Sequence, residues 1–219
     1  TSATSGVLQR AVDLDPGALA FEYDTGLYLR FSAATPDDFA LAYAVSRCDA
    51  GDYRAADELV APLIERRPDW LQARWVRVAM HYRTGRWSDV VRLLTPIVTD
   101  PRLDEVYAHA VRIALGTALA RLGMYPPALS YLEEPDGPIE VARTDGTFVK
   151  ALCLRAQGEE DDAHDVLTEL YAANPEHEAV QAALSDPSYG IVPTTAARIE
   201  ARTDPWDPKS VVADTSGRE

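Results

Sequence analysis

Two short stretches near the N-terminus place an apolar residue at every second position. They are Ala18–Tyr23 and Leu27–Ser32, and this alternation is typical of half-buried β-strands. The residues between them, Asp24-Thr25-Gly26, suit a three-residue loop with glycine in the left-handed conformation. The pattern predicts a small β-hairpin, which must pack on other elements because an isolated hairpin is marginal in water.

From Thr35 onward the apolar residues recur at steps of three and four, the period of an amphipathic helix. Thr35-Pro36-Asp37-Asp38 is a typical helix start, with a capping threonine, a proline at the first position and acids in the first turn. The pattern predicts four helix pairs: Asp37–Ala50 with Asp52–Arg66, Asp69–Thr84 with Trp87–Val98, Arg102–Leu122 with Tyr125–Glu133, and Ile139–Gln157 with Glu159–Ala173. A shorter helix, Pro175–Leu184, would follow them.

The turns between the paired helices repeat. Glycines at positions 51, 85, 123 and 158 lie 34, 38 and 35 residues apart, and an aromatic residue follows two positions after each of the first three. A helix–turn–helix unit with a period near 34 is the signature of tetratricopeptide (TPR) repeats. We therefore predict an all-α fold of TPR-like helical-hairpin repeats in a superhelix, with one small β-hairpin near the N-terminus.

Composition divides the chain into three parts. Residues 1–36 form an N-terminal segment with the β-hairpin, and residues 37–190 hold the TPR-like repeats. Residues 191–219 are rich in proline, threonine, serine and aspartate, which indicates a connector rather than another repeat.

Charge and chemistry narrow the function classes. The net charge is −14 and the sequence pI about 4.7, which argues against nucleic-acid partners and anionic membrane surfaces. No apolar run is long enough to cross a bilayer. The two cysteines and four histidines are scattered, so we interpret them as packing or surface residues rather than metal ligands. No phosphate loop or catalytic motif is visible, so we expect no enzyme activity and no cofactor in this chain.

An acidic run, Glu159-Glu160-Asp161-Asp162, is best interpreted as the first turn of a helix, where carboxylates meet the positive end of the helix dipole. A stronger candidate for partner contact is the concave surface that the first helices of TPR pairs line. Counting back from each turn glycine gives six candidate groove residues: Asp49, Trp75, Tyr82, Arg83, Arg121 and Arg155. The alternative is that Trp75 and Tyr82 are core residues that seal neighbouring helices.

The C-terminal stretch carries a resemblance to a known family. It contains Asp186-Pro187-Ser188-Tyr189, then Pro193-Thr194-Thr195-Ala196, and then Asp204-Pro205-Trp206-Asp207-Pro208. These residues resemble the junction between the TPR-like N-terminal domain and the AAA-type ATPase domain of EccA proteins. EccA proteins are cytosolic ATPases of mycobacterial type VII (ESX) secretion systems. Over the repeats the likeness is weaker but collinear.

The resemblance implies a longer protein that hydrolyses ATP with Mg²⁺ and assembles as a homo-hexamer in the cytoplasm. Its nucleotide-binding residues would lie beyond Glu219, so that residues 191–219 lead toward a C-terminal ATPase domain. The part described by this sequence would engage secreted type VII substrates or other secretion components. The alternative is a regulatory or assembly domain that controls ATPase oligomerisation and activity without binding substrate. Trp206 is predicted to dock on a hydrophobic surface and set the interdomain angle.

Overall fold

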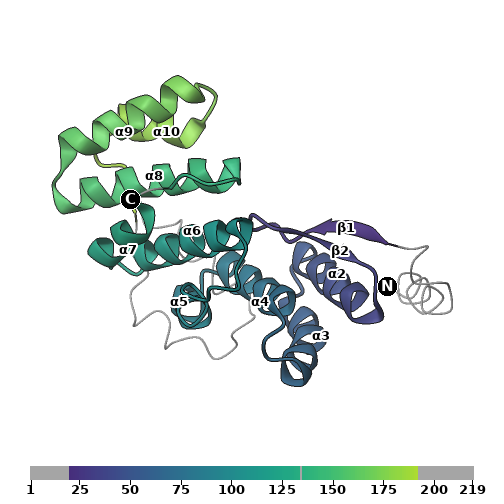
Figure 1. Cartoon of the computed structure of the whole chain (residues 1–219). Helices are drawn as coiled ribbons and strands as arrows, with labels where there is room; N and C mark the ends of the chain where they lie inside the picture. The colour runs from purple at the N-terminus through teal and green to yellow at the C-terminus, as the bar shows by residue number, and fades with distance from the viewer. Residues whose placement is uncertain (1–19, 134, 192–219) are drawn as a thin grey trace. The chain divides into compact units, whose positions relative to one another are not determined.

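The computed structural model describes residues 20–133 and 135–191 (Figure 1). Its described residues divide into two compact units, residues 20–85 and residues 86–191, and the division falls within the second predicted helix pair. Two parts of the sequence predictions lie outside the described residues: residues 1–19, which include Ala18 and Leu19 of the first predicted strand, and the connector from residue 192 onward, which includes Trp206.

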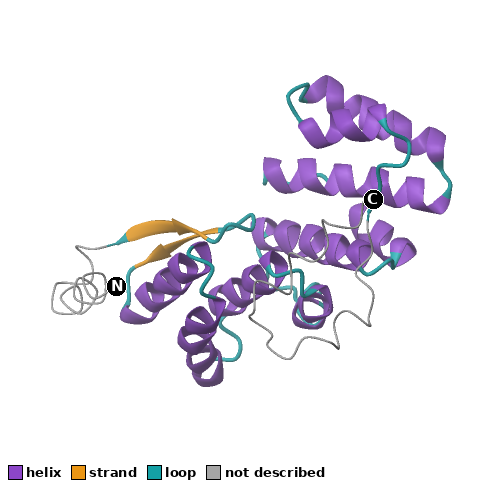
Figure 2. Cartoon of the chain, turned by 180° about the vertical axis from the view of Figure 1, so that it is seen from behind, coloured by secondary structure: helices purple, strands orange, loops and turns teal. Residues whose placement is uncertain are grey.

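The β-hairpin forms, but its loop is longer than predicted. Strand β1 (Phe21–Asp24) pairs antiparallel with β2 (Arg30–Ala33), with Asp24 opposite Arg30 (Figure 2). The connection runs from residue 25 to residue 29, which corrects the predicted three-residue loop. Gly26 is left-handed as predicted, with φ of 70°.

The loop explains why Leu27 and Leu29 misled the strand prediction. Both leucines are buried, at 4% and 3% exposure, so their spacing reflects a loop folded onto the helices and not the face of a strand. The Thr25 hydroxyl donates to the Leu29 carbonyl at 2.7 Å and closes the loop internally. Because the Leu29 carbonyl has a hydrogen-bond donor within the loop, it does not need one from the opposite strand.

In the first unit the hairpin is followed by α2 (Pro36–Asp49), α3 (Tyr53–Arg66) and α4 (Leu71–Arg83). Helix α2 starts with a capping box, because the Thr35 side chain accepts from the Asp38 amide and the Asp38 carboxylate accepts from the Thr35 amide. The three helices pack on one another, and β2 packs on α2. Their core consists mainly of aliphatic side chains, including Leu41, Val45, Val60, Leu63, Val76 and Met80.

The second unit contains the other described helices: α5 (Trp87–Leu94), α6 (Glu105–Arg121), α7 (Tyr125–Leu132), α8 (Glu140–Gln157), α9 (Glu160–Ala173) and α10 (Glu178–Ser185). Each helix packs on the next, and α6 also packs on α8. Helix α6 is buried from His109 to Ala120 except at Arg112. Two glycines allow the neighbouring helices to pack this closely on α6. A Cβ on Gly116 would lie 2.7 Å from Leu132 Cγ, and one on Gly146 would lie 2.7 Å from Ile113 Cδ1. Helix α8 runs through Gly146 without interruption.

The repeated turns confirm the helical-hairpin register. The glycines that follow α2, α4, α6 and α8 all have positive φ, between 65° and 87°, a conformation that side chains with a Cβ rarely adopt. Some helix ends differ from the prediction because polar side chains cap them. Helix α6 begins after Asp104, whose carboxylate accepts from the Tyr107 amide, and α10 begins after His177, whose ring accepts from the Val180 amide.

Candidate functional site

Trp75 is a core residue, which corrects its assignment to an exposed groove. Its side chain is 2% exposed and its Nε1–H donates to the Leu27 carbonyl at 2.9 Å. The indole of α4 thereby ties the hairpin loop to the helices. The alternative interpretation of Trp75, a residue that seals neighbouring elements, is the one the structure supports.

Arg83 and Asp49 lie together at the same loop. Arg83 Nη1 donates to Asp49 Oδ1 at 2.6 Å, and Arg83 Nη2 donates to the Thr25 carbonyl at 3.1 Å. A Cβ on Gly26 would collide with this guanidinium, so the loop approaches α4 closely at that point. Tyr82 is half-buried. These residues of the first unit form one arrangement, in which α4 holds the β1–β2 loop through Trp75 and Arg83.

Arg121 is the most accessible of the candidate residues in the second unit. It lies at the end of α6, is exposed, and places its guanidinium carbon 5.9 Å from the centre of the Trp87 ring. A cation–π contact at an exposed site contributes about 0.5–1 kcal/mol. Its guanidinium is therefore only lightly held and can turn toward a partner.

Arg155 has a structural role instead. Its side chain is only 10% exposed, and Nη1 donates to the carbonyls of Ala183 and Tyr189, each at 3.0 Å. Nε donates to Glu160 Oε2 at 3.2 Å. The Phe148 ring of the same helix lies 6.2 Å from the Tyr189 ring. Helix α8 thus fixes the segment that follows α10, and the guanidinium has few donors left for a ligand.

His109 is an organising residue that sequence reasoning missed. It is buried, its Nε2–H donates to the Pro135 carbonyl at 2.9 Å, and its Nδ1 accepts from the Ile139 amide at 3.2 Å. Burial lowers the pKa of His109 below its usual value, which favours this neutral tautomer. Gly137 lies against the ring so closely that a Cβ there would collide with it. The nearest sequence signal is Pro135-Asp136-Gly137-Pro138, whose prolines and glycine predict a turn between two helices but do not point to His109.

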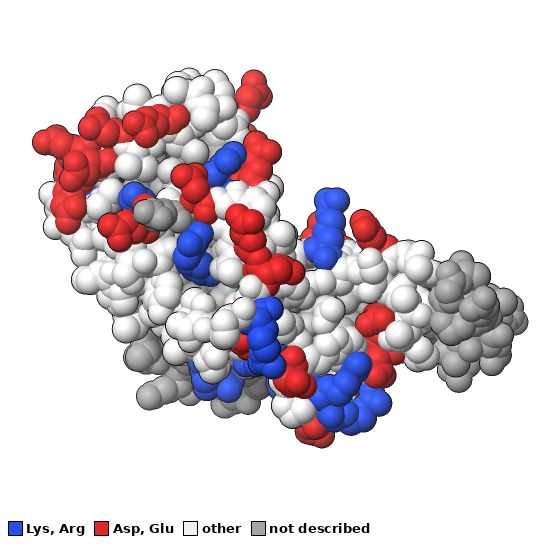
Figure 3. Space-filling view, viewed as in Figure 1, with Lys and Arg blue, Asp and Glu red and all other residues white. Residues whose placement is uncertain are grey.

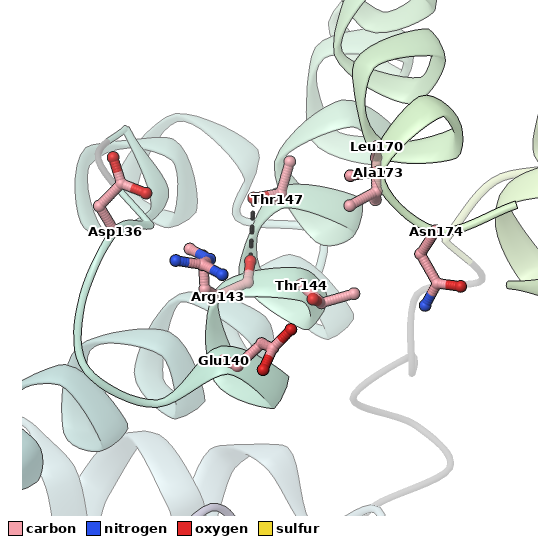
Figure 4. Close-up of a pocket in the computed structure, with 8 residues that line it drawn as sticks. All are labelled: Asp136, Glu140, Arg143, Thr144, Thr147, Leu170, Ala173 and Asn174. Carbon is pink, nitrogen blue, oxygen red and sulfur yellow. Dashed lines mark hydrogen bonds between the residues drawn. The ribbon is translucent and has the colours of Figure 1, made fainter.

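The structure also contains a pocket that no sequence pattern indicated. It has a volume of about 260 Å³ and lies between the start of α8 and the end of α9 (Figure 4). None of the six sequence-predicted residues lines it, since no motif marks positions that are about 30 residues apart and meet only in the fold. Its lining combines charged, polar and apolar side chains: Asp136, Glu140, Arg143, Thr144, Thr147, Leu170, Ala173 and Asn174.

The described residues offer few other reactive or metal-binding side chains. Cys48 and Cys153 are free and buried, as predicted, and burial raises their thiol pKa values to about 11 and about 12. Across residues 20–133 and 135–191 there is no group of three or more side chains suited to holding a metal ion. No helix in the same ranges is long and apolar enough to cross a membrane.

The comparisons with known proteins decide the family. Residues 1–212 match the family described as the N-terminal domain of the ESX-1 secretion system protein EccA1. The chain belongs to the EccA family of type VII secretion proteins. It is 62% identical over 213 residues to the ESX-3 secretion system protein EccA3 of Mycobacterium leprae, covering 96% of this chain and 33% of that protein. It is 60% identical over 210 residues to EccA3 of Mycolicibacterium smegmatis, covering 96% and 34%.

The fold is confirmed by a solved structure. The crystal structure of the N-terminal domain of the EccA1 ATPase, from the ESX-1 secretion system of Mycobacterium tuberculosis, matches with a TM-score of 0.74 and 31% identity. The match covers 94% of this chain and 76% of that one. The chain therefore has the mainly helical EccA N-terminal fold with its TPR-like hairpins. It spans about a third of the length of the curated EccA3 relatives.

Proposed function

We propose that this chain is the protein-interaction domain of an ESX-3-type EccA ATPase. In this proposal it engages secreted substrates or other secretion components in the cytoplasm. A C-terminal domain, homo-hexameric and using ATP with Mg²⁺, supplies the energy for export. The observation that carries the proposal is the identity of 60% or more to EccA3 proteins over nearly the whole chain.

The fold is compatible with this role. TPR-like arrays bury a continuous core between neighbouring hairpins and leave side chains of successive repeats on extended surfaces for partners. Among the candidate residues, Arg121 is exposed and only lightly held, and exposed arginines are frequent anchors in protein interfaces. The acidic balance of the chain fits a protein partner better than a nucleic acid.

The test is co-purification with the 219-residue chain as bait. Substrates of the ESX-3 system and of a second ESX system from the same genome are presented at several concentrations. We expect saturable capture of the ESX-3 set, weakened by Arg121→Ala. The matched control is Arg92→Ala, which removes another exposed arginine, on α5. Absence of capture, or equal capture of both sets, would contradict the proposal.

The second candidate function is control of ATPase assembly and activity without substrate binding. One observation favours it: Arg155 holds the Ala183 and Tyr189 carbonyls and so fixes the segment that leads toward the connector. The full-length protein separates the two functions. If removing residues 1–190 changes oligomer size and ATPase rate while no substrate binds the bait, the regulatory function replaces the interaction function.

A further inference from the structure

The pocket between the start of α8 and the end of α9 has a lining suited to one long basic side chain. We propose that it receives a lysine side chain of a partner polypeptide, an inference that rests on the proposed interaction function. Leu170 and Ala173 provide an apolar wall for the methylene stem. Glu140, Thr144 and Asn174 provide oxygen acceptors, and an ammonium group has three hydrogens to donate. In Figure 4 Thr144 lies between Glu140 and Asn174, with Leu170 and Ala173 on the α9 side.

The size of the pocket favours a single side chain. Sites that enclose whole small molecules have volumes of about 300–1,000 Å³, whereas this pocket has about 260 Å³. A single extended side chain needs less space, and its backbone can remain outside on the surface. The proposed ligand is therefore one side chain of a polypeptide.

Electrostatics favour a cation in three ways. First, the lining has two carboxylates, Asp136 and Glu140, against one guanidinium, Arg143, and neither carboxylate forms an ion pair with another described residue. Second, Ala173 and Asn174 lie at the end of α9, where helix carbonyls give a negative pole that favours cations. The last turn of α9 has no basic residue of its own to occupy that position.

Third, α9 and the segment around it are acidic. From Glu159 to Ile191 the sequence has nine carboxylate side chains and no lysine or arginine. Figure 3 shows acidic side chains gathered over the part of the surface that α9 forms. Such a field attracts basic segments but is not selective by itself. The pocket adds selectivity, because it supplies defined acceptors next to an apolar wall.

Arg143 defines which end of the pocket receives the ammonium. In Figure 4 it lies on the Asp136 side, away from Asn174. A cation at that end would be repelled by the guanidinium. Glu140 lies one turn before Arg143 on α8, so the Thr144–Asn174 side of the pocket is the side farther from the guanidinium.

The test uses the isotope-labelled 219-residue chain and two peptide probes. One probe is acetyl-Ala-Lys-Ala-amide, and the other replaces lysine with norleucine, which keeps the stem and lacks the ammonium. We expect the lysine probe to shift the amide resonances of Thr144, Ala173 and Asn174 saturably. The norleucine probe should bind at least about threefold more weakly, because the charged hydrogen bonds are lost.

Matched variants separate the pocket from the general acidity. Glu140→Gln, on α8, should weaken lysine binding about threefold or more. Asp165→Asn removes the same charge from an exposed position on α9 and should leave binding within about 1.5-fold. Equal loss in both variants would overturn the site in favour of a diffuse acidic surface. Equal binding of the two probes, or no shift at these residues, would also overturn it. Any of these failures leaves co-purification of ESX-3 substrates unaffected, so the proposed function is tested separately.

Discussion

Replacing Arg155 with methionine should destabilise the second unit, although Arg155 resembled a ligand-binding residue in the sequence. The Arg155 side chain is 10% exposed, and its guanidinium donates to the carbonyls of Ala183 and Tyr189 at 3.0 Å each. Methionine retains much of the unbranched stem but cannot donate, so both carbonyls lose a charged donor. We therefore expect Arg155→Met to release the segment around Tyr189 from α8.

The size of the effect follows from these contacts. A hydrogen bond to a charged group contributes about 1.5–3 kcal/mol, and methionine packing recovers part of the loss of two. We expect Arg155→Met to lower the free energy of unfolding by about 2–4 kcal/mol. The ion pair with Glu160 adds little, because that carboxylate is 58% exposed and surface pairs contribute about 1 kcal/mol or less. Glu160→Gln is therefore the matched control.

Thermal unfolding measures the loss of stability, and amide hydrogen exchange measures the release of the segment around Tyr189. For a domain of this size, about 3 kcal/mol corresponds to a melting temperature lower by roughly 6–12 °C. The amides of Asp186 and Tyr189, which donate to the Ala182 and Asp186 carbonyls, should exchange faster. Arg155→Lys should be intermediate, since an ammonium cannot match the guanidinium fork. If Arg155→Met melts and exchanges like the unaltered chain, the anchoring role is refuted.

Three further predictions concern other parts of the chain. Burial lowers the pKa of His109, so as pH falls below about 6.5 the unfolded chain binds a proton at this residue before the folded chain does. The free energy of unfolding should therefore decline on acidification. Urea unfolding at several pH values should show a smaller decline for His109→Gln. Gly123→Val should cost about 1–3 kcal/mol because φ is 75°, whereas Gly123→Asn should cost less; equal melting temperatures would contradict this. Trp206 should dock on an apolar surface in the full-length protein; in a variant whose other tryptophans are replaced, free-tryptophan emission and quenching would exclude docking.

Local signals made most of the fold predictable from sequence. Thr35 with Asp38, the turn glycines and the helical apolar period each act within a few residues, and the corresponding elements form where expected. The β-hairpin loop was less predictable, because its conformation depends on distant groups. Trp75 and Arg83, 48 and 58 residues from their loop partners, donate to the loop carbonyls, and no pattern around residue 25 announces them.

The candidate site residues were harder to place because a repeat position has two possible roles. Asp49, Arg83 and Arg121 each lie two residues before a turn glycine, and this shared position was taken to face a groove. In a stacked array, residues one period apart also lie on neighbouring hairpins. Asp49 and Arg83 are separated by 34 residues and form an ion pair at 2.6 Å. Arg121 likewise lies 34 residues from Trp87 and packs over its ring.

This spacing explains why chemistry alone could not separate binding residues from structural ones. An arginine near the end of a first helix is chemically suited to a partner carboxylate, and equally suited to an aspartate, a ring or a carbonyl on the neighbouring hairpin. Which of these roles it takes depends on whether such an acceptor lies within reach inside the fold. Arg83 and Arg155 find carbonyls there, whereas among residues 20–133 and 135–191 Arg121 has only the weaker contact with a ring. Of the arginines on the predicted surface, Arg121 is therefore the one whose removal should affect partner binding more than stability.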